Sequence, residues 1–449
     1  MPRTRRILAA ALVALVVSGS IAPAASTGAP PLPDILIVTV DTLRADHLSI
    51  YGDPRPITPN LDRLLARGMR FKQARTLEPL TSPSMVSLFT SLHPHEHGST
   101  RNGLRMRPGL ASLSGELARA GYVRAAFVSN WTLRRKLCGL GDHFDQYQEV
   151  LTEKRWFGMV RSESAAPDVT RHALAWLDGH RAAGGREPVL LWVHYSDPHA
   201  PYDFHPEHAE ALGIDGGRKP GPRDRYATEV AFTDAAIGVL LDELGRRGLR
   251  DNLLVVFAAD HGESLGEHDY WGHGANLLDK GLRIPMGIAW PGRVPAMAVS
   301  QPALISDIAP TVLGLLGRPS PRSFKGYDWS QVARGAPAPA SRVTFHQVHR
   351  GAVMKRHRSE QARRSGLLEV AAVHRGRKEI LSLAGGVLAF DLRADPSELS
   401  PDAEWTGPSK GLQAWLRTIQ TALDAQVQTA GEELDEEDLE RLKALGYVD

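Results

Sequence analysis

Cysteine is almost absent from this chain: Cys138 is the only one among 449 residues. A single thiol excludes an internal disulfide, and it excludes the metal sites that are built from several cysteines. Because Cys138 stands next to Leu137 and close to Leu140, we interpret it as a small apolar residue of the core.

An excess of charge of either sign is also missing. The chain has 53 Lys and Arg against 51 Asp and Glu, which leaves a formal net charge of +2. This balance gives no electrostatic reason to expect nucleic acid or another polyanion as a partner. The sequence also contains no internal repeat and no glycine-rich motif of the kind that cradles phosphates.

Long apolar runs are limited to the N-terminus. Arg3, Arg5 and Arg6 precede an apolar run over residues 7–17, and small residues follow at 22–25. This layout is typical of a secretory signal peptide, so we predict that residues 1–25 are removed and that the protein is exported, to the periplasm or the extracellular space. The run is short for a membrane span, and an uncleaved anchor is the weaker alternative. We expect no stable membrane span after signal removal.

Short apolar runs alternate with helical patterns over the first three quarters of the chain. Residues 35–40 form a nearly continuous apolar run, as expected for a strand buried on both faces. Similar runs recur at 125–128, 189–193 and 253–257. The alternation predicts an α/β fold with a large, mostly parallel sheet sandwiched by helices. In such sheets ligands bind beyond the carboxyl ends of the strands.

Proline, glycine and serine become frequent over residues 317–339, which indicates a boundary between domains. We predict a domain over residues 30–325 that carries the chemistry, and a C-terminal subdomain over residues 340–449. Short strand-like segments and a helical pattern near residues 411–427 predict that this subdomain is a small antiparallel sheet with a helix.

Polar residues gather directly after several of the strand-like runs. Asp41 follows the first run, His199 lies shortly after the third, and Asp260 and His261 follow the fourth. Two carboxylates and an imidazole suit zinc or manganese, whereas a shell of oxygens alone suits calcium or magnesium better. Each residue could instead bond to a turn or a neighbouring loop, and we interpret His194 as a hydrogen-bonded strand histidine.

Thr81 precedes Pro83 and a helical pattern over residues 85–92. Proline is well placed in the first turn of a helix, where its missing N–H costs nothing. A hydroxyl at that turn faces free backbone donors and the positive end of the helix dipole, which suits an oxyanion or a bound anion. The structural alternative is that Thr81 or Ser82 only caps the helix.

Taken together, these motifs resemble the sulfatases of the alkaline-phosphatase superfamily. The similarity runs in order from about residue 34 to about residue 316. It implies an alkaline-phosphatase-like fold and metal-dependent hydrolysis of a sulfate or phosphate ester, with a small molecule or a glycan as the substrate. The segments that carry it are Asp41-Thr42-Leu43-Arg44-Ala45-Asp46, Thr58-Pro59-Asn60-Leu61-Asp62, Thr81-Ser82-Pro83-Ser84, His97-Gly98, Asp197-Pro198-His199-Ala200-Pro201-Tyr202 and Asp260-His261-Gly262-Glu263.

The chain departs from the family at the nucleophile. Sulfatases oxidise a residue of a Cys-x-Pro-x-Arg motif to formylglycine, but Thr81 occupies that position here, and Met85 occupies the position of the arginine. Thr42 stands where the family often has a second acid. The expected Gly-Lys-x-His segment is missing near residues 129–131, and His273 replaces a lysine expected to touch the sulfate. These departures favour a plain threonine nucleophile, as in related branches of the superfamily.

The resemblance to those threonine-dependent branches implies one divalent metal ion, zinc, manganese or calcium. Asp41, Asp260 and His261 would bind the ion, which would lower the pKa of the Thr81 hydroxyl. Thr81 would then attack phosphorus or sulfur and form a covalent ester with the enzyme.

Three further residues are candidates for contacts with the substrate. His199 and His273 would contact the non-bridging oxygens or protonate the leaving group. Asn102 could donate to the same oxygens, and a role as a turn residue is about as probable a priori. A second metal on Asp197, His199 and His273 is a weaker alternative. Two other functions stay open: a phosphoethanolamine-type phosphotransferase of the cell envelope, and a non-catalytic binder of sulfated or phosphorylated glycans.

Overall fold

The computed structural model describes residues 31–155, 160–215, 219–351, 366–405 and 407–425. The predicted signal peptide over residues 1–25 lies outside this part of the chain, and so do residues 426–449 of the predicted C-terminal subdomain. Among the described residues, no helix combines the length and the apolar character needed to cross a bilayer.

An eight-stranded sheet forms the centre of the fold, in the order β12-β2-β11-β8-β1-β7-β3-β4. All neighbouring strands are parallel except β11, which is antiparallel to both β2 and β8. The predicted fold class is therefore confirmed. The strands are β1 (Asp34–Val40), β2 (Met69–Arg75), β3 (Val123–Val128), β4 (Gln146–Glu149), β7 (Val189–Tyr195), β8 (Leu253–Ala259), β11 (Met286–Ala289) and β12 (Met297–Leu304).

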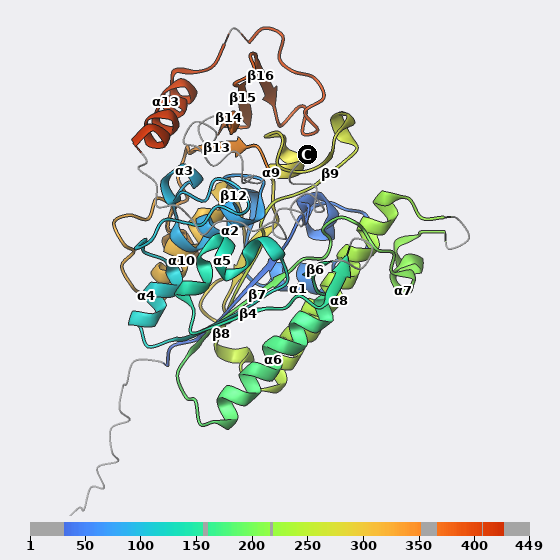
Figure 1. The fold of residues 1–449 in the computed structure, drawn as a ribbon, viewed down its shortest axis with the longest axis vertical. Coiled ribbons are helices and arrows are strands. Elements are labelled where there is room, and N and C mark those ends of the chain that lie inside the picture. The colour runs from blue at the N-terminus through green and yellow to red at the C-terminus, as the bar shows by residue number, and fades with distance from the viewer. Residues whose placement is uncertain (1–30, 156–159, 216–218, 352–365, 406, 426–449) are drawn as a thin grey trace, which may run out of the picture. The chain divides into compact units, whose positions relative to one another are not determined.

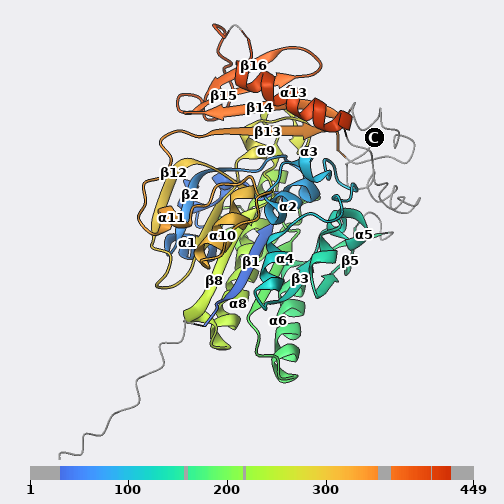
Figure 2. The same ribbon diagram turned by 90° about the vertical axis from the view of Figure 1, so that its left-hand side faces the viewer.

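Helices cover both faces of this sheet (Figures 1 and 2). One group packs together on one face and consists of α1 (Pro59–Ala66), α6 (Ala166–Ala182) and α8 (Pro222–Arg246). The other group consists of α2 (Thr81–Thr90), α4 (Leu113–Arg119) and α10 (Ile308–Leu315). The shorter helices are α3 (Pro94–His97), α5 (Arg135–Cys138), α7 (Pro206–Ala209), α9 (Asp279–Leu282) and α11 (Ser330–Ala333), and two hairpins are β5–β6 (Glu153–Arg155, Val160–Glu163) and β9–β10 (Ser264–Leu265, Trp271–Gly272).

Helix α2 differs from its prediction because it begins at Thr81, four residues before the predicted start. All ten of its residues are buried, which its lack of charged side chains permits. Pro83 is the third residue of the helix, where no intrahelical N–H bond is lost. Cys138 is buried, as predicted, and burial raises the pKa of its thiol to about 11.

A second, four-stranded antiparallel sheet follows in the chain: β13 (Val343–His349), β14 (Leu367–His374), β15 (Arg377–Ser382) and β16 (Val387–Asp391). Helix α13 (Lys410–Ala425) packs on it through Leu412 and Ile419. This is the small antiparallel sheet with a helix that the sequence predicts. The boundaries 30–325 and 340–449 as separate domains stay a prediction.

Strand β13 is bonded to the loop that leads into α2. A ring nitrogen of His346, Nδ1, donates to the carbonyl of Thr76 (2.8 Å), and the amide of Gln347 donates to the carbonyl of Leu77 (3.0 Å). The amide of His349 donates to a carboxylate oxygen of Glu78 (2.8 Å). The second sheet therefore fixes the backbone just before Thr81.

His346 should make the stability of this arrangement depend on pH. Burial, with a further contribution from Arg75, lowers the pKa of His346 to about 3, against 6.5 for an unperturbed histidine. Between these values the unfolded chain binds the extra proton and the folded chain does not. Stability should therefore fall as pH drops from 6.5 towards 3, by up to about 1.4 kcal/mol per pH unit for this residue. We expect His346→Gln to reduce that slope, measured by urea unfolding from pH 7 to pH 4.5.

The matched control is His374→Gln, on β14 of the same sheet, where the side chain is only partly buried. Identical slopes in His346→Gln and the unmodified chain would contradict the assignment.

Candidate active site

Two buried acids follow neighbouring strands at the carboxyl edge of the main sheet. Val40 and Ala259 are register partners on the parallel strands β1 and β8, and Asp41 and Asp260 directly follow them. The backbone continues the pairing, since the amide of Asp260 donates to the carbonyl of Val40 (3.2 Å). Both side chains are fully buried. Parallel pairing in register is thus enough to bring together two carboxylates 219 positions apart in sequence.

Each carboxylate has one oxygen bonded to the protein and one without a partner among the described residues. Asp260 Oδ1 accepts hydrogen bonds from the amides of His261 (2.6 Å) and Thr42 (3.1 Å). Asp41 Oδ2 accepts a hydrogen bond from the side-chain amide of Asn130. The remaining oxygens, Asp41 Oδ1 and Asp260 Oδ2, accept no hydrogen bond in the described part of the chain.

His261 points its Nε2 atom at those two oxygens. The atom lies 3.7 Å from Asp41 Oδ1 and 3.5 Å from Asp260 Oδ2. The other ring nitrogen, Nδ1, is 2.9 Å from the carbonyl of Gly262, and it must donate there because a carbonyl only accepts. Burial, together with the charge of His273, holds the pKa of His261 well below its ordinary value. The neutral ring therefore offers the Nε2 lone pair to the carboxylate side of the cavity.

A second histidine, His194, lies next to this group as well as being the hydrogen-bonded strand histidine that the sequence predicts. Nδ1 of His194 contacts the hydroxyl of Thr39 (2.8 Å), as a hydrogen-bonded strand histidine would. Its Nε2, however, lies 3.9 Å from Asp41 Oδ2 and has no hydrogen-bond partner among the described residues. Ligand atoms of Asp41, His194 and Asp260 all lie within 4.8 Å of one another. Its position could have indicated this, because His194 is the last residue but one of β7, which is the strand next to β1.

The residues present fit a divalent cation. Burial raises the pKa of Asp41 to about 6, and burial together with the charge of Asp41 raises the pKa of Asp260 well above its ordinary range. Two such neighbouring carboxylates are unfavourable as anions unless a positive charge compensates them. Carboxylate oxygens and imidazole nitrogens are the donors that zinc and manganese accept.

Thr81 opens helix α2 beside this group. Its hydroxyl oxygen, Oγ1, lies 3.5 Å from Nε2 of His261. The helix is fixed there by Ser84, whose hydroxyl donates to the main-chain carbonyl of Asp260 (2.6 Å). Neither Thr81 nor Ser82 caps the helix, because Leu80 is the N-cap residue and makes no side-chain bond.

Asn102 binds the same helix end. Its Oδ1 accepts a hydrogen bond from the amide of Ser82 (3.0 Å), so the side chain takes over the capping function that the sequence offered to Thr81 or Ser82. Its Nδ2 has no partner among the described residues and could donate to a ligand.

His199 and His273 each face a buried glutamate. His199 Nδ1 lies 3.4 Å from Glu163, and His273 Nδ1 lies 3.1 Å from Glu263. The ring of His273 is 5.4 Å from that of His199 and 4.4 Å from that of His261, between centroids. Burial alone would lower the pKa of His199, but the hydrogen bond to Glu163 and the charges of the surrounding carboxylates raise it to about 10. His199 is therefore a cation at neutral pH.

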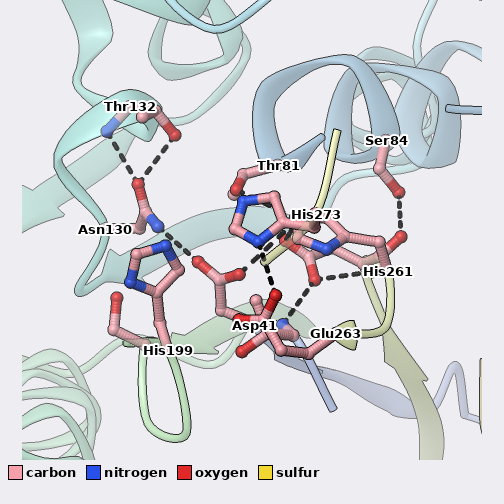
Figure 3. Close-up of polar contacts among 12 residues, drawn as sticks. Asp41, Thr81, Ser84, Asn130, Thr132, His199, His261, Glu263 and His273 are labelled. Carbon is pink, nitrogen blue, oxygen red and sulfur yellow. Dashed lines mark hydrogen bonds and ion pairs between the residues drawn. The ribbon is translucent and has the colours of Figure 1, made fainter. Parts of the chain in front are cut away.

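The structure thus brings together the residues predicted from sequence. Figure 3 shows Asp41, Thr81, His199, His261 and His273 in one cluster, and the hydrogen bonds described above connect Asp260 and Asn102 to it. Sequence reasoning missed four contacts of that cluster: His194, Asn130, Glu163 and Glu263. Glu263 stands inside the recognised Asp-His-Gly-Glu segment, which was a usable signal. Glu163 ends the hairpin β5–β6 and carries no local motif, so only the folded chain reveals it. The predicted chemical roles of all these residues stay untested by the geometry.

Comparisons with known proteins agree with the resemblance. The family model described as Sulfatase matches residues 33–318. The ulvan-active sulfatase of Formosa agariphila is 27% identical over 346 residues, which cover 70% of this chain and 67% of that protein. The N-acetylgalactosamine-6-sulfatase of Homo sapiens is 28% identical over 353 residues, which cover 67% of this chain and 66% of that protein. The chain thus spans about two thirds of the length of these relatives.

Solved structures share the fold. The crystal structure of Ps i-CgsB has a TM-score of 0.70 at 21% identity, covering 92% of this chain and 98% of that one. The phosphonate monoester hydrolase of Agrobacterium radiobacter has a TM-score of 0.63 at 21% identity, covering 87% and 96%. Because the family model spans well over half of the residues and the fold agrees, the chain belongs to the sulfatase family of ester hydrolases, within the alkaline-phosphatase superfamily.

Proposed function

We propose that this protein hydrolyses a sulfate or phosphate ester with Thr81 as the nucleophile. The observation that carries the proposal is the position of the Thr81 hydroxyl, 3.5 Å from the His261 nitrogen that faces the unpartnered oxygens of Asp41 and Asp260. A threonine that merely stabilised its helix would not need to lie beside the histidine that faces two buried acids.

Asp41, Asp260 and His261 would hold a divalent cation, and His194 is added to them as a fourth ligand. When bound, such a cation lowers the pKa of a nearby hydroxyl and neutralises charge on the incoming anion. The Thr81 oxygen forms a bond to phosphorus or sulfur while the bond to the organic alcohol breaks. The departing oxygen takes up a proton, and water then cleaves the ester on Thr81 to release the inorganic anion and regenerate the hydroxyl.

Two side chains suit the non-bridging oxygens of the substrate. His199 is cationic because Glu163 faces it, so it can offset negative charge. Asn102 presents an N–H group without a partner in the described part of the chain. His273 is oriented by Glu263 and lies between His261 and His199, which suits a group that gives a proton to the leaving oxygen.

Two sets of observations support different types of ester substrate. The relatives named above are sulfatases, which supports a sulfate ester. Thr81 cannot become formylglycine from cysteine, and one structural neighbour is named a phosphonate monoester hydrolase, which supports phosphorus. We therefore propose both esters as substrates to be compared directly, with a glycan or a small molecule as the organic part. Export of the protein is proposed from the residues 1–25 pattern alone.

Replacing Thr81 by Ala should remove the nucleophile and lower kcat by at least about 10³-fold on every ester that the protein turns over. Thr81→Ser keeps a hydroxyl and should retain measurable turnover. The measurement is steady-state hydrolysis of 4-nitrophenyl sulfate, 4-nitrophenyl phosphate and bis(4-nitrophenyl) phosphate.

A matched control is Thr90→Ala, which removes a buried hydroxyl from the other end of the same helix, where it bonds only to the carbonyl of Val86. That variant should keep its activity if it folds, as judged by circular dichroism. Unchanged turnover in Thr81→Ala would exclude the proposed nucleophile.

The metal site should be visible in the composition of the purified protein. We expect about one divalent ion per chain by elemental analysis, and we expect Asp260→Asn and His194→Asn each to weaken metal binding by at least about tenfold. His346→Asn, a buried histidine on β13 outside this cluster, is the matched control and should retain the ion. A gently purified, folded protein without any divalent ion would instead favour a non-catalytic glycan-binding role.

A further inference from the structure

Trp271 is an exposed indole beside the candidate active site. Its side chain is 52% exposed, and it is the only aromatic residue among the large exposed hydrophobic side chains of the described residues. Trp131, Trp192 and Trp329, by contrast, are among the most deeply buried side chains of the fold. Tryptophan is costly to leave in water, so a single exposed indole next to a polar site is a candidate ligand contact.

The hairpin β9–β10 holds this ring in place. Trp271 pairs with Leu265 across the hairpin, and the amide of Gly266 donates to the carbonyl of Tyr270 (3.0 Å). Gly266 has a φ of +94°, and a Cβ atom at that position would lie 2.8 Å from the indole carbon Cζ2. The indole therefore lies directly against the backbone of Gly266, and any residue larger than glycine at position 266 would collide with it. About half of the surface of Trp271 remains exposed to solvent.

The same hairpin connects Trp271 to the site. Glu263 immediately precedes β9 and His273 immediately follows β10, and these two side chains contact each other at 3.1 Å. The hydroxyl of Tyr270 donates to the carbonyl of His273 (2.6 Å), which fixes that turn of chain. Trp271 and His273 are two positions apart in the chain, so their Cα atoms lie at most roughly 7 Å from each other. The His273 ring in turn lies 4.4 Å from the ring of His261, the neighbour of Thr81.

We propose that Trp271 is a stacking platform for the sugar ring that carries the ester group, so that the organic part of the substrate is a glycan. This rests on the proposed function of the Thr81 site. A pyranose presents a face of C–H groups that packs on a flat indole, while its hydroxyls stay in water or bond to polar neighbours. Because Trp271 lies two positions from His273 in the same hairpin, a sugar ring on the indole would have its ester group on the side of the site.

Two alternative ligands of the Trp271 indole, a quaternary ammonium ion and a second copy of the chain, fit less well than a sugar. A quaternary ammonium ion binds best in a cage of several aromatic rings, and Trp271 is the only exposed aromatic among the described residues. A second copy of the chain would need a larger apolar patch around the indole than one ring supplies. Tyr202, from the segment that contains His199, is not a second exposed ring beside Trp271. It is near Glu263 of the site, and burial and then the charge of Glu263 raise the pKa of its hydroxyl.

The test compares sugar esters with esters that have no ring. The probes are the 6-sulfate and 6-phosphate of N-acetylglucosamine, glycerol sulfate, glycerol phosphate and phosphocholine. The readout is the ratio of kcat/KM for the sugar ester to kcat/KM for the glycerol ester of the same acid. We expect Trp271→Ala to lower this ratio roughly tenfold, mainly through KM, which is the usual size for losing one stacked ring. Trp271→Phe should restore most of the ratio, whereas Trp271→Leu, apolar but not flat, should not.

The matched control is Val239→Ala on α8, where the side chain is also 52% exposed; it should leave the ratio at the value of the unmodified chain. An equal ratio in Trp271→Ala and Val239→Ala would overturn the proposal, and so would a chain that cleaves glycerol esters but neither sugar ester. A larger loss on phosphocholine than on the sugar esters, or a loss of self-association on gel filtration with an unchanged ratio, would also overturn it. A different result would overturn the Thr81 proposal: Thr81→Ala would then retain turnover on all probes.

Discussion

The pair of buried carboxylates at the ends of β1 and β8 is the constraint on which the site depends. Asp41 and Asp260 are adjacent because their strands are parallel and in register, not because of any local attraction. Their surroundings satisfy only half of their oxygens, through Asn130, Thr42 and the amide of His261. Burial raises the pKa values of both acids, and the charge of Asp41 adds to the effect on Asp260. The pair therefore favours a positive charge at a place that two imidazole nitrogens also face.

Helix α2, which begins with the proposed nucleophile Thr81, is bonded to the backbone next to this pair. Ser84 of α2 bonds to the carbonyl of Asp260, and the loop before Thr81 bonds to the edge strand of the second sheet through His346 and Gln347. The second sheet therefore contributes to the site without supplying any of its seven predicted residues. These contacts, one within the helix and one in the loop before it, hold the hydroxyl of Thr81 in position at the first residue of a ten-residue helix.

The sequence predicted the features of the fold and site that depend on the periodicity of apolar residues and on the order of motifs along the chain. Apolar runs became the central strands, and Asp41, Asp260 and His261 met because the carboxyl ends of parallel strands share one edge. What it could not predict depends on which way a single side chain turns. His194 lies within a buried strand, so only coordinates show that one nitrogen contacts Thr39 and the other faces Asp41. Glu163 reaches His199 from a hairpin with no motif, and no spacing rule connects the two.

The charge of the site gives an independent reason for a cation. Asp41, Asp260, Glu163 and Glu263 each lie near a histidine of the site that is proposed to bind an anionic ester, and in their ionised form they would repel such a substrate. The resemblance implies lysines at two positions of the site, but the expected lysine segment is absent near Asn130, and a histidine stands at position 273. The protonated form of His199 favoured by Glu163, and a divalent ion held by the two aspartates, would supply this compensation. The proposed threonine nucleophile and the missing lysines are therefore consistent with the same proposed dependence on a metal.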